Sequence, residues 1–348
     1  MRQDIGTDDA VARGAGFLRA AQDGGLWRDY DFLGPSDGWM TAYVALTLAG
    51  LPGDDNRLAA TEAFARLAHE QDDTGGWAYN ALQPRDADST GWVLQLGRAL
   101  GRPSEEEWAV RARSFVSRHV HQDGLVATYT MELAGPQFLS YPAIPSWVGW
   151  CAGHDCVTAA VAALDELPEH DRIVDGLLAR QLDGGQWRAY WWVDQELTTA
   201  LACEALTSVP RAADACRAAA TWAASRIGPY GAVRTELHPE GSPFATALAL
   251  RTLSAAPDAG HDEVGAAAIR WLVEAQHQDG SWTPSARLRM PFPWEPDADA
   301  HEDWTFDGTG KKLLGTIARD TEGLHTAATV VTALATATRR CLDRNRIG

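Results

Sequence analysis

The sequence predicts an all-α fold in which six helical hairpins close into one ring, an (α/α)6 toroid. Three observations predict it. A glycine turn closed by Trp or Val recurs six times, a helical pattern precedes each turn, and a more apolar helical pattern follows it. The closing residues are 50, 49, 61, 46 and 49 positions apart. Such self-similarity at a nearly fixed period indicates a repeat architecture.

Each turn is expected to end an outer, amphipathic helix. The six turns are Gly25-Leu26-Trp27, Gly75-Gly76-Trp77, Gly124-Leu125-Val126, Gly185-Gln186-Trp187, Gly231-Ala232-Val233 and Gly280-Ser281-Trp282. Five of them follow a glutamine, namely Gln22, Gln71, Gln122, Gln181 and Gln278. Glycine can stop the helix in a left-handed conformation, and the tryptophan can then fold back over the helix end.

The helix after each turn is expected to lie inside the ring, because it is apolar on most of its faces. These inner helices are predicted at Thr41–Gly50, Ser89–Gly101, Thr158–Leu167, Leu197–Val209, Phe244–Leu253 and Thr326–Thr338. Six hairpins give twelve helices. An open stack would be a solenoid, but neither end shows polar capping helices, which favours closure. We therefore predict one domain over residues 1–348.

Composition excludes several classes of partner. The net charge of −17 argues against nucleic acid and against anionic membrane surfaces. No apolar stretch is long enough to predict a transmembrane segment, and the polar residues 1–9 do not resemble a signal peptide. Five cysteines, an odd number, lie in apolar helical patterns, which suits reduced thiols in the cytoplasm. The oligomeric state is left open.

Two connections between an outer and an inner helix are much longer than the others. They span residues 127–153 and 283–323, in the third and sixth repeats, and both are rich in proline and aromatic residues. Two long insertions at one end of a ring predict lids over a shared mouth. They would otherwise shield the core or form an oligomer contact.

The Gln-x-x-Gly-x-Trp turns resemble the repeats of the squalene/hopene cyclase and protein prenyltransferase β-subunit superfamily, over essentially the whole chain. The stretch Asp86-Ala87-Asp88-Ser89-Thr90-Gly91 is also similar to the Asp-x-Asp-Asp-Thr-Ala motif of class II terpenoid cyclases. Ser89 replaces the third aspartate of that motif, and Gly91 replaces its alanine. The resemblance implies a single-barrel cyclase with Asp88 at the position of the family's proton donor.

Acidic residues recur at the expected starts of the inner helices. These are Asp37, Asp88, Asp155, Asp194 and Glu322. Each could simply cap its helix, because carboxylates accept from free N–H groups and meet the positive end of the dipole. Together they still predict an acidic rim around one mouth of the ring.

We expect an enzyme that starts the cyclisation of an isoprenoid, or another hydrophobic alkene, by protonating it. Asp88 is the expected acid, Asp86 the neighbour that raises its pKa, and Asp155 the reserve. Aromatic faces would stabilise the cation by about 0.5–2 kcal/mol each. The expected substrate-binding residues are Trp39, Trp92, His154, Trp191, Trp192, Glu196, His325, Trp304, Lys311 and Lys312.

Two other functions fit the same sequence. The first is a hydrolase or lyase that uses paired carboxylates on a glycan or another polar metabolite. The second is a binding barrel without catalysis. A dry, aromatic pocket would favour the cyclase, and a wet groove with separated carboxylates would favour the hydrolase.

No cofactor and no metal are expected. Lys311 and Lys312 follow a glycine-rich stretch and could hold a diphosphate, in which case Mg²⁺ would accompany the substrate. His325 is similar to the zinc-ligand histidine of protein prenyltransferase β subunits. The nearest partners for it, Asp155 and Cys156, belong to the opposite repeat, and zinc needs its ligands within about 2.0–2.3 Å.

Overall fold

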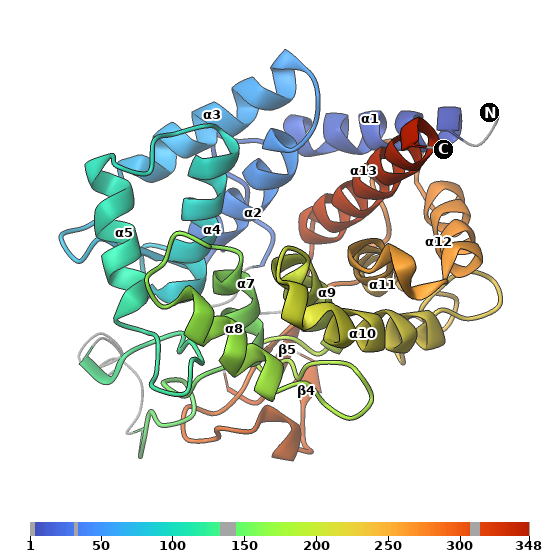
Figure 1. Ribbon diagram of the computed structural model, residues 1–348. Helices are drawn as coiled ribbons and strands as arrows, with labels where there is room; N and C mark the ends of the chain where they lie inside the picture. The colour runs from blue at the N-terminus through green and yellow to red at the C-terminus, as the bar shows by residue number, and fades with distance from the viewer. Residues whose placement is uncertain (1–3, 31–33, 133–143, 307–313, 348) are drawn as a thin grey trace.

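The computed structural model describes residues 4–30, 34–132, 144–306 and 314–347 (Figure 1). In these ranges the chain forms twelve α-helices, which confirms the helix-rich fold. They are α1 (Asp4–Ala20), α2 (Asp37–Ala49), α3 (Asp54–Ala68), α4 (Ala87–Ala99), α5 (Glu107–Ser117), α7 (Asp155–Ala162), α8 (His170–Ala179), α9 (Gln195–Leu206), α10 (Ala213–Arg226), α11 (Pro243–Ala255), α12 (Asp262–Glu274) and α13 (Leu324–Ile347). Most inner helices begin two to four residues before the predicted positions.

The helices alternate between buried and peripheral positions. The six apolar helices pack in chain order, α2 on α4, then α7, α9, α11 and α13, and α13 packs back on α2. The remaining helices pack outside this series, and α1, α3, α5, α10 and α12 lie around the edge of the view in Figure 1. The first helix of the chain is thereby joined to the last, because α1 packs on α13.

A threonine near the start of each inner helix fixes the turn before it. The turn N–H of Trp27 donates to Thr41 Oγ1, and that of Trp77 donates to Thr90 Oγ1, both at 2.9 Å. Equivalent bonds join Val126 to Thr158, Trp187 to Thr199 and Val233 to Thr246. In the last repeat the donor to Thr326 is instead Ser285, three residues after the turn tryptophan. Four turn tryptophans also donate Nε1–H to a carbonyl of their outer helix, at Leu18, Leu67, Leu177 and Leu272.

The repeat glutamines join neighbouring repeats. Gln181 Nε2 donates to Gly185 O in its own turn and to Ala215 O of the next outer helix, both at 2.8 Å. In the last repeat the bridging residue is Gln276, which donates to Gly280 O and to Ala10 O of α1. At three of the turns the bridging glutamine stands four residues before the turn glycine, so in the last repeat it is Gln276 and not Gln278.

Glycine is required where a turn touches the next outer helix. Gly185 has φ 97°, and a Cβ there would lie 2.4 Å from Ala218 O of α10. Gly124 has φ 86°, and its Cβ would lie 2.0 Å from Arg172 O of α8. Both positions therefore exclude side chains through backbone conformation and through contact.

The two long insertions contact one another. Trp150 Nε1 donates to Pro291 O at 3.0 Å, and Gly149 N donates to Pro293 O at 2.7 Å. The second insertion contains a small sheet in the order β3 (Arg287–Met290), β5 (Thr316–Arg319), β4 (Thr305–Phe306). A two-stranded pair, β1 (Trp77–Ala78) and β2 (Arg85–Asp86), precedes α4. The all-α prediction missed these strands.

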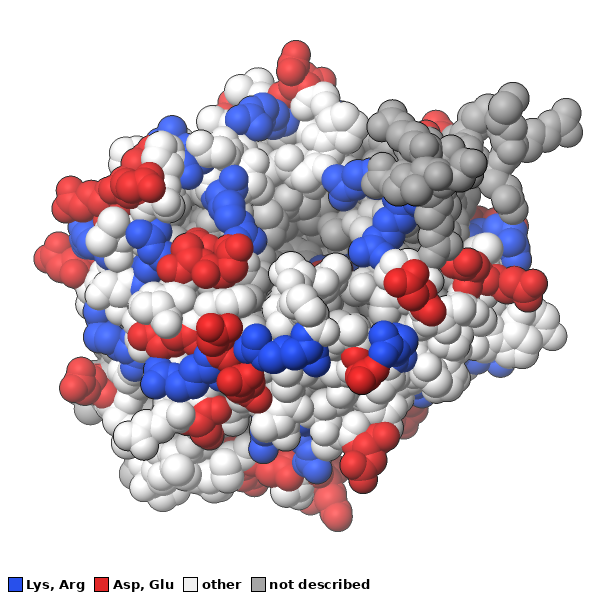
Figure 2. Space-filling view, in the orientation of Figure 1, with Lys and Arg blue, Asp and Glu red and all other residues white. Residues whose placement is uncertain are grey.

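The surface carries both signs of charge. In Figure 2 acidic and basic side chains are interspersed over the visible face, and that face is hollowed near its centre. Across the described ranges, no helix has the length and apolar character needed to cross a bilayer.

Candidate active site

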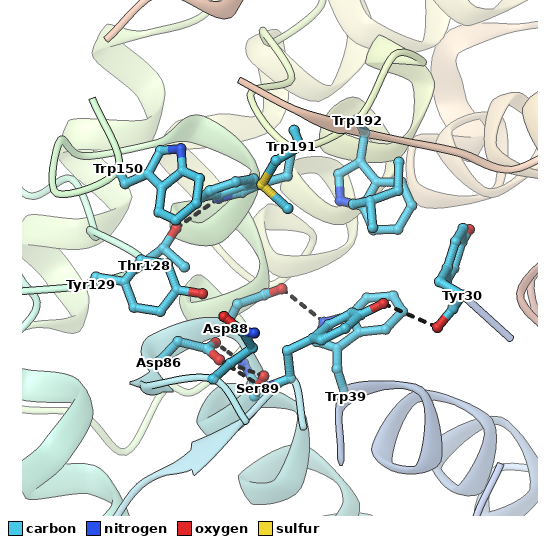
Figure 3. A pocket seen from close by; sticks show the side chains of 14 residues that line it. Tyr30, Trp39, Asp86, Asp88, Ser89, Thr128, Tyr129, Trp150, Trp191 and Trp192 are labelled. Carbon is cyan, nitrogen blue, oxygen red and sulfur yellow. Dashed lines mark hydrogen bonds between the residues drawn. The ribbon is translucent and has the colours of Figure 1, made fainter. Parts of the chain in front are cut away.

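A cavity lies where the N-terminal end of α4 meets the two insertions. Its empty volume is about 660 Å³, including the part that opens to solvent, and this falls in the range of small-molecule sites. The lining residues are Tyr30, Trp39, Tyr79, Gln83, Asp86, Asp88, Ser89, Thr128, Tyr129, Trp150, Trp191, Trp192, Leu288 and Met290 (Figure 3). Seven of these fourteen residues are aromatic, and two, Asp86 and Asp88, carry carboxyl groups.

Asp86 serves mainly to hold the start of α4. It is the N-cap residue, and its Oδ1 accepts from Ser89 N at 2.6 Å. Its Oδ2 accepts from Ser89 Oγ at 2.8 Å and from Tyr79 N at 3.1 Å. The side chain is 3% exposed, so these bonds replace the water that it loses on folding.

Ser89 gives a physical reason for the departure from the terpenoid-cyclase motif. Its hydroxyl is a neutral donor to Asp86, whereas an aspartate at this position would be a second carboxylate that donates only when it is protonated. The substitution therefore leaves Asp86 fully hydrogen-bonded without requiring a shared proton.

Asp88 is held differently and borders the cavity. Its Oδ2 accepts from Trp39 Nε1 at 2.8 Å, and its Oδ1 accepts from Trp92 Nε1 at 3.1 Å. Its side chain is only partly buried, unlike that of Asp86. In Figure 3 it lies between Asp86 and Trp39, and Trp150, Trp191 and Trp192 stand across the cavity from it.

Both carboxyl groups bind protons more strongly than in water. Burial, followed by repulsion from Asp88, raises the pKa of Asp86 to about 7. Burial raises the pKa of Asp88 to about 6, against the two indole hydrogen bonds, which lower it. The indoles favour the carboxylate left after proton transfer, while burial raises the share of Asp88 that carries its proton at a given pH.

The aromatic wall presents several ring faces close together. Trp39 lies 5.5 Å from Trp192 between ring centroids, and Trp191 lies 5.5 Å from Trp150. Trp191 is fixed by its Nε1–H, which donates to Thr128 Oγ1 at 2.7 Å. Rings held in this way can stabilise a cation without bonding to it.

A deeper cavity adjoins this one below Asp88. It shares Trp39, Asp88, Trp191 and Trp192 with the first cavity. Its other walls are Tyr43, Trp92, Cys156, Val157, Leu197 and Leu201. Asp88 therefore borders both cavities.

Three predicted residues are paired or stacked away from this cavity. Asp155 accepts from Arg180 Nε at 2.9 Å, and Glu196 accepts from Arg226 Nε at 2.8 Å. His154 stacks on Tyr190 with centroids 3.6 Å apart, and its Nε2 bonds to Gly149 O. None of the three lines the first cavity, so Asp155 as a reserve acid and the other two as substrate contacts stay predictions that this cavity does not support.

The remaining predicted residues divide into three groups. Trp39, Trp191 and Trp192 line the first cavity, and Trp92 lines the deeper one. His325 is buried among aromatic rings and bonds through Nδ1 to Tyr30 Oη at 2.9 Å, so it lies behind the cavity wall. Trp304 lies under Arg289 in the second insertion and does not line the cavity. Lys311 and Lys312 are outside the described residues.

Sequence reasoning missed part of the lining. Tyr129, Trp150, Thr128, Leu288 and Met290 line the cavity but were not among the predicted site residues. The available signal was the alternation Arg-Leu-Arg-Met at 287–290, which predicts a strand with one face turned inward. Across the described ranges, no three His, Cys, Asp or Glu side chains are grouped as metal ligands.

The arrangement is suited to protonating an apolar substrate. It joins Asp88, whose carboxyl group has a raised pKa and accepts from two indoles, to a wall of aromatic rings, while the second carboxyl group, Asp86, is bonded into the start of α4. A helix-rich fold with such an acid in an aromatic cavity defines the class of terpenoid cyclase-like proteins.

Comparison with solved structures identifies the family within that class. A protein from Actinoplanes superposes with a TM-score of 0.92, at 57% identity over 95% of this chain and 99% of that one. A variant of the type II terpene cyclase MstE from Scytonema gives 0.91, at 37% identity over 97% of this chain and 98% of that one. The chain belongs to the type II terpene cyclases. No protein-family model matches it.

A curated relative is more distant. The drimenyl diphosphate synthase of Streptomyces showdoensis is 26% identical over 309 residues, which is 85% of this chain and 53% of that protein. The chain thus spans about half the length of this relative.

Proposed function

We propose that this chain cyclises an isoprenoid substrate by proton transfer from Asp88. The observation that carries the proposal is the Asp88 carboxyl group, which borders an aromatic cavity and accepts from two indoles. The proton passes to the terminal alkene carbon, whose π electrons form the new C–H bond. The next alkene then attacks the cation and closes a ring, and loss of one proton ends the reaction as an isomerisation.

The geometry supports the cyclase over the hydrolase. A hydrolase with paired carboxylates needs an acid and a base that both face the substrate. Asp86 is instead engaged in the cap of α4 by three donors. One carboxyl group facing an aromatic wall suits protonation of an alkene better than hydrolysis of a polar bond.

The substrate is proposed to be a small, hydrophobic prenylated compound. An MstE variant from Scytonema was solved in complex with geranylgeranyl dihydroxybenzoate, given as its substrate, and another with merosterolic acid A, given as the product. Incubating this chain with that benzoate, and separately with farnesyl diphosphate, is expected to convert one of them to an isomer of unchanged mass. Two fragments whose masses together equal the substrate plus one water would favour the hydrolase instead.

The rate is expected to fall as the pH rises through the pKa of Asp88. The acid must carry its proton to react, and the pKa of Asp88 is raised to about 6. We expect kcat/KM to be highest below about pH 6 and to fall by up to about tenfold per pH unit above it. Asp86, with a pKa of about 7, can spread this fall over a wider range, because the pair titrates together. A rate that rises with pH across this range would contradict the role of an acid.

The finer architecture is also proposed. We infer one (α/α)6 toroid over residues 1–348, with segments 127–153 and 283–323 as lids over one mouth. The closed series of helix contacts supports the ring, and the bonds from Trp150 and Gly149 to the second insertion support a shared cover.

No cofactor is proposed, because a carboxylic acid suffices for this chemistry. Mg²⁺ would accompany only a diphosphate substrate, and the cytoplasm stays a prediction from cysteine usage.

A further inference from the structure

A separate cavity opens at the C-terminal ends of the inner helices, opposite the mouth that holds Asp88. Leu46, Thr47, Gly50 and Leu51 line it from the end of α2, and Thr332, Ala335 and Arg339 line it from α13. Its empty volume is about 420 Å³, and the exposed residues Gly50 and Arg339 lie at its outer edge. We call it the far cavity. It gives water an approach to the inside of the ring.

Two side chains separate the far cavity from the deeper cavity below Asp88. Tyr43 and Trp92 line both. They are 3% and 4% exposed, so little of either side chain is open to solvent. We call Tyr43 and Trp92 together the partition. Their ring centroids lie 4.9 Å apart, and at Tyr43 a single side chain separates the two cavities.

Tyr43 is fixed at its hydroxyl group by polar side chains and at its ring by other aromatic rings. Its hydroxyl oxygen accepts from Arg251 Nη1 at 3.1 Å and lies 2.9 Å from Thr329 Oγ1. Arg251 is itself held by Glu204 through two bonds, at 2.8 and 2.6 Å. The ring of Tyr43 stacks on Trp39 at 5.4 Å between centroids. The ion pair of Arg251 and Glu204 thus fixes Tyr43 without lining the deeper cavity.

We propose that Tyr43, held by Arg251, closes the deeper cavity against water from the far cavity. It would thereby determine whether the final carbocation loses a proton or is captured by water. This inference rests on the proposed cyclisation. The final cation can lose a proton from a neighbouring carbon and form an alkene. Alternatively, water oxygen can bond to the cationic carbon and release a proton to solvent, which gives an alcohol. Excluding water that would enter from the far cavity favours formation of the alkene.

The first test follows water into the product. Wild type, Tyr43→Ala and Tyr43→Phe are incubated with geranylgeranyl dihydroxybenzoate in ¹⁸O-water, and the products are analysed by mass spectrometry. Tyr43→Ala is expected to raise the share of ¹⁸O-labelled alcohol at least several-fold. Tyr43→Phe keeps the ring but loses the bond from Arg251, so we expect a smaller rise. Arg339→Gln, which changes the far cavity but not the partition, is the control.

The second test does not depend on turnover. Cys156 lines the deeper cavity, and burial raises the pKa of its thiol to about 11, so it should react slowly with iodoacetamide. Tyr43→Ala is expected to speed alkylation of the Cys156 peptide at least tenfold relative to wild type and to Arg339→Gln. Circular dichroism confirms that the variants are folded. Unchanged Cys156 reactivity in folded Tyr43→Ala would overturn the partition. Faster alkylation of Cys156 in a protein that does not convert geranylgeranyl dihydroxybenzoate would overturn only the proposed reaction.

Discussion

Asp88→Asn is expected to lower turnover by at least about 10²-fold, because a general acid usually contributes about 10²–10⁴-fold. Asparagine keeps the size of the side chain, and its amide oxygen can still accept from Trp39 or Trp92, so the wall should stay in place. It cannot donate a proton of comparable acidity. The measurement is single-turnover conversion of the substrate, with circular dichroism and thermal unfolding on the same sample.

Asp155→Asn is the matched comparison for this experiment. Asp155 also lies at the start of an inner helix, but it pairs with Arg180 and does not line the cavity. We expect its variant to keep turnover within a few-fold, although it loses part of an ion pair. If Asp88→Asn kept near-normal turnover in a folded protein, the acid would have to be another group.

Trp187→Ala is expected to lower the free energy of unfolding by about 3–5 kcal/mol, as for other fully buried aromatic residues. Trp187 is completely buried in the turn between α8 and α9. Its Nε1 donates to Leu177 O at 2.7 Å, and its backbone N donates to Thr199. The substitution leaves a cavity and an unpaired carbonyl at the end of an outer helix. Urea denaturation followed by tryptophan fluorescence measures the loss.

Val110→Ala on α5 is the control for stability, because this side chain is 48% exposed. Surface substitutions of this kind usually change stability by less than about 0.5 kcal/mol. Equal unfolding midpoints for Trp187→Ala and Val110→Ala would show that the turn tryptophan Trp187 does not stabilise the fold.

The repeat could be predicted because its signals are local. A glycine that must adopt positive φ, a tryptophan two residues later and an apolar helix after it are close in sequence. The matching threonine was missed, although Thr41, Thr90 and Thr158 are all present in the predicted inner helices. Only the structure shows that their hydroxyls accept from the turn N–H groups.

The sequence by itself determined the helix-rich repeat fold and the candidacy of Asp86 and Asp88, which adjoin one helix start. Only the tertiary structure decided their different roles, because these depend on partners far away in the chain. The indole of Trp39, 49 residues away, bonds to Asp88, while Asp86 turns back into its own helix. Likewise Asp155 looked equivalent to Asp88 in sequence, and only the fold brings Arg180 against it. Contacts across repeats, which local patterns do not record, therefore distinguish the proposed acid Asp88 from the helix cap Asp86 and the ion-paired Asp155.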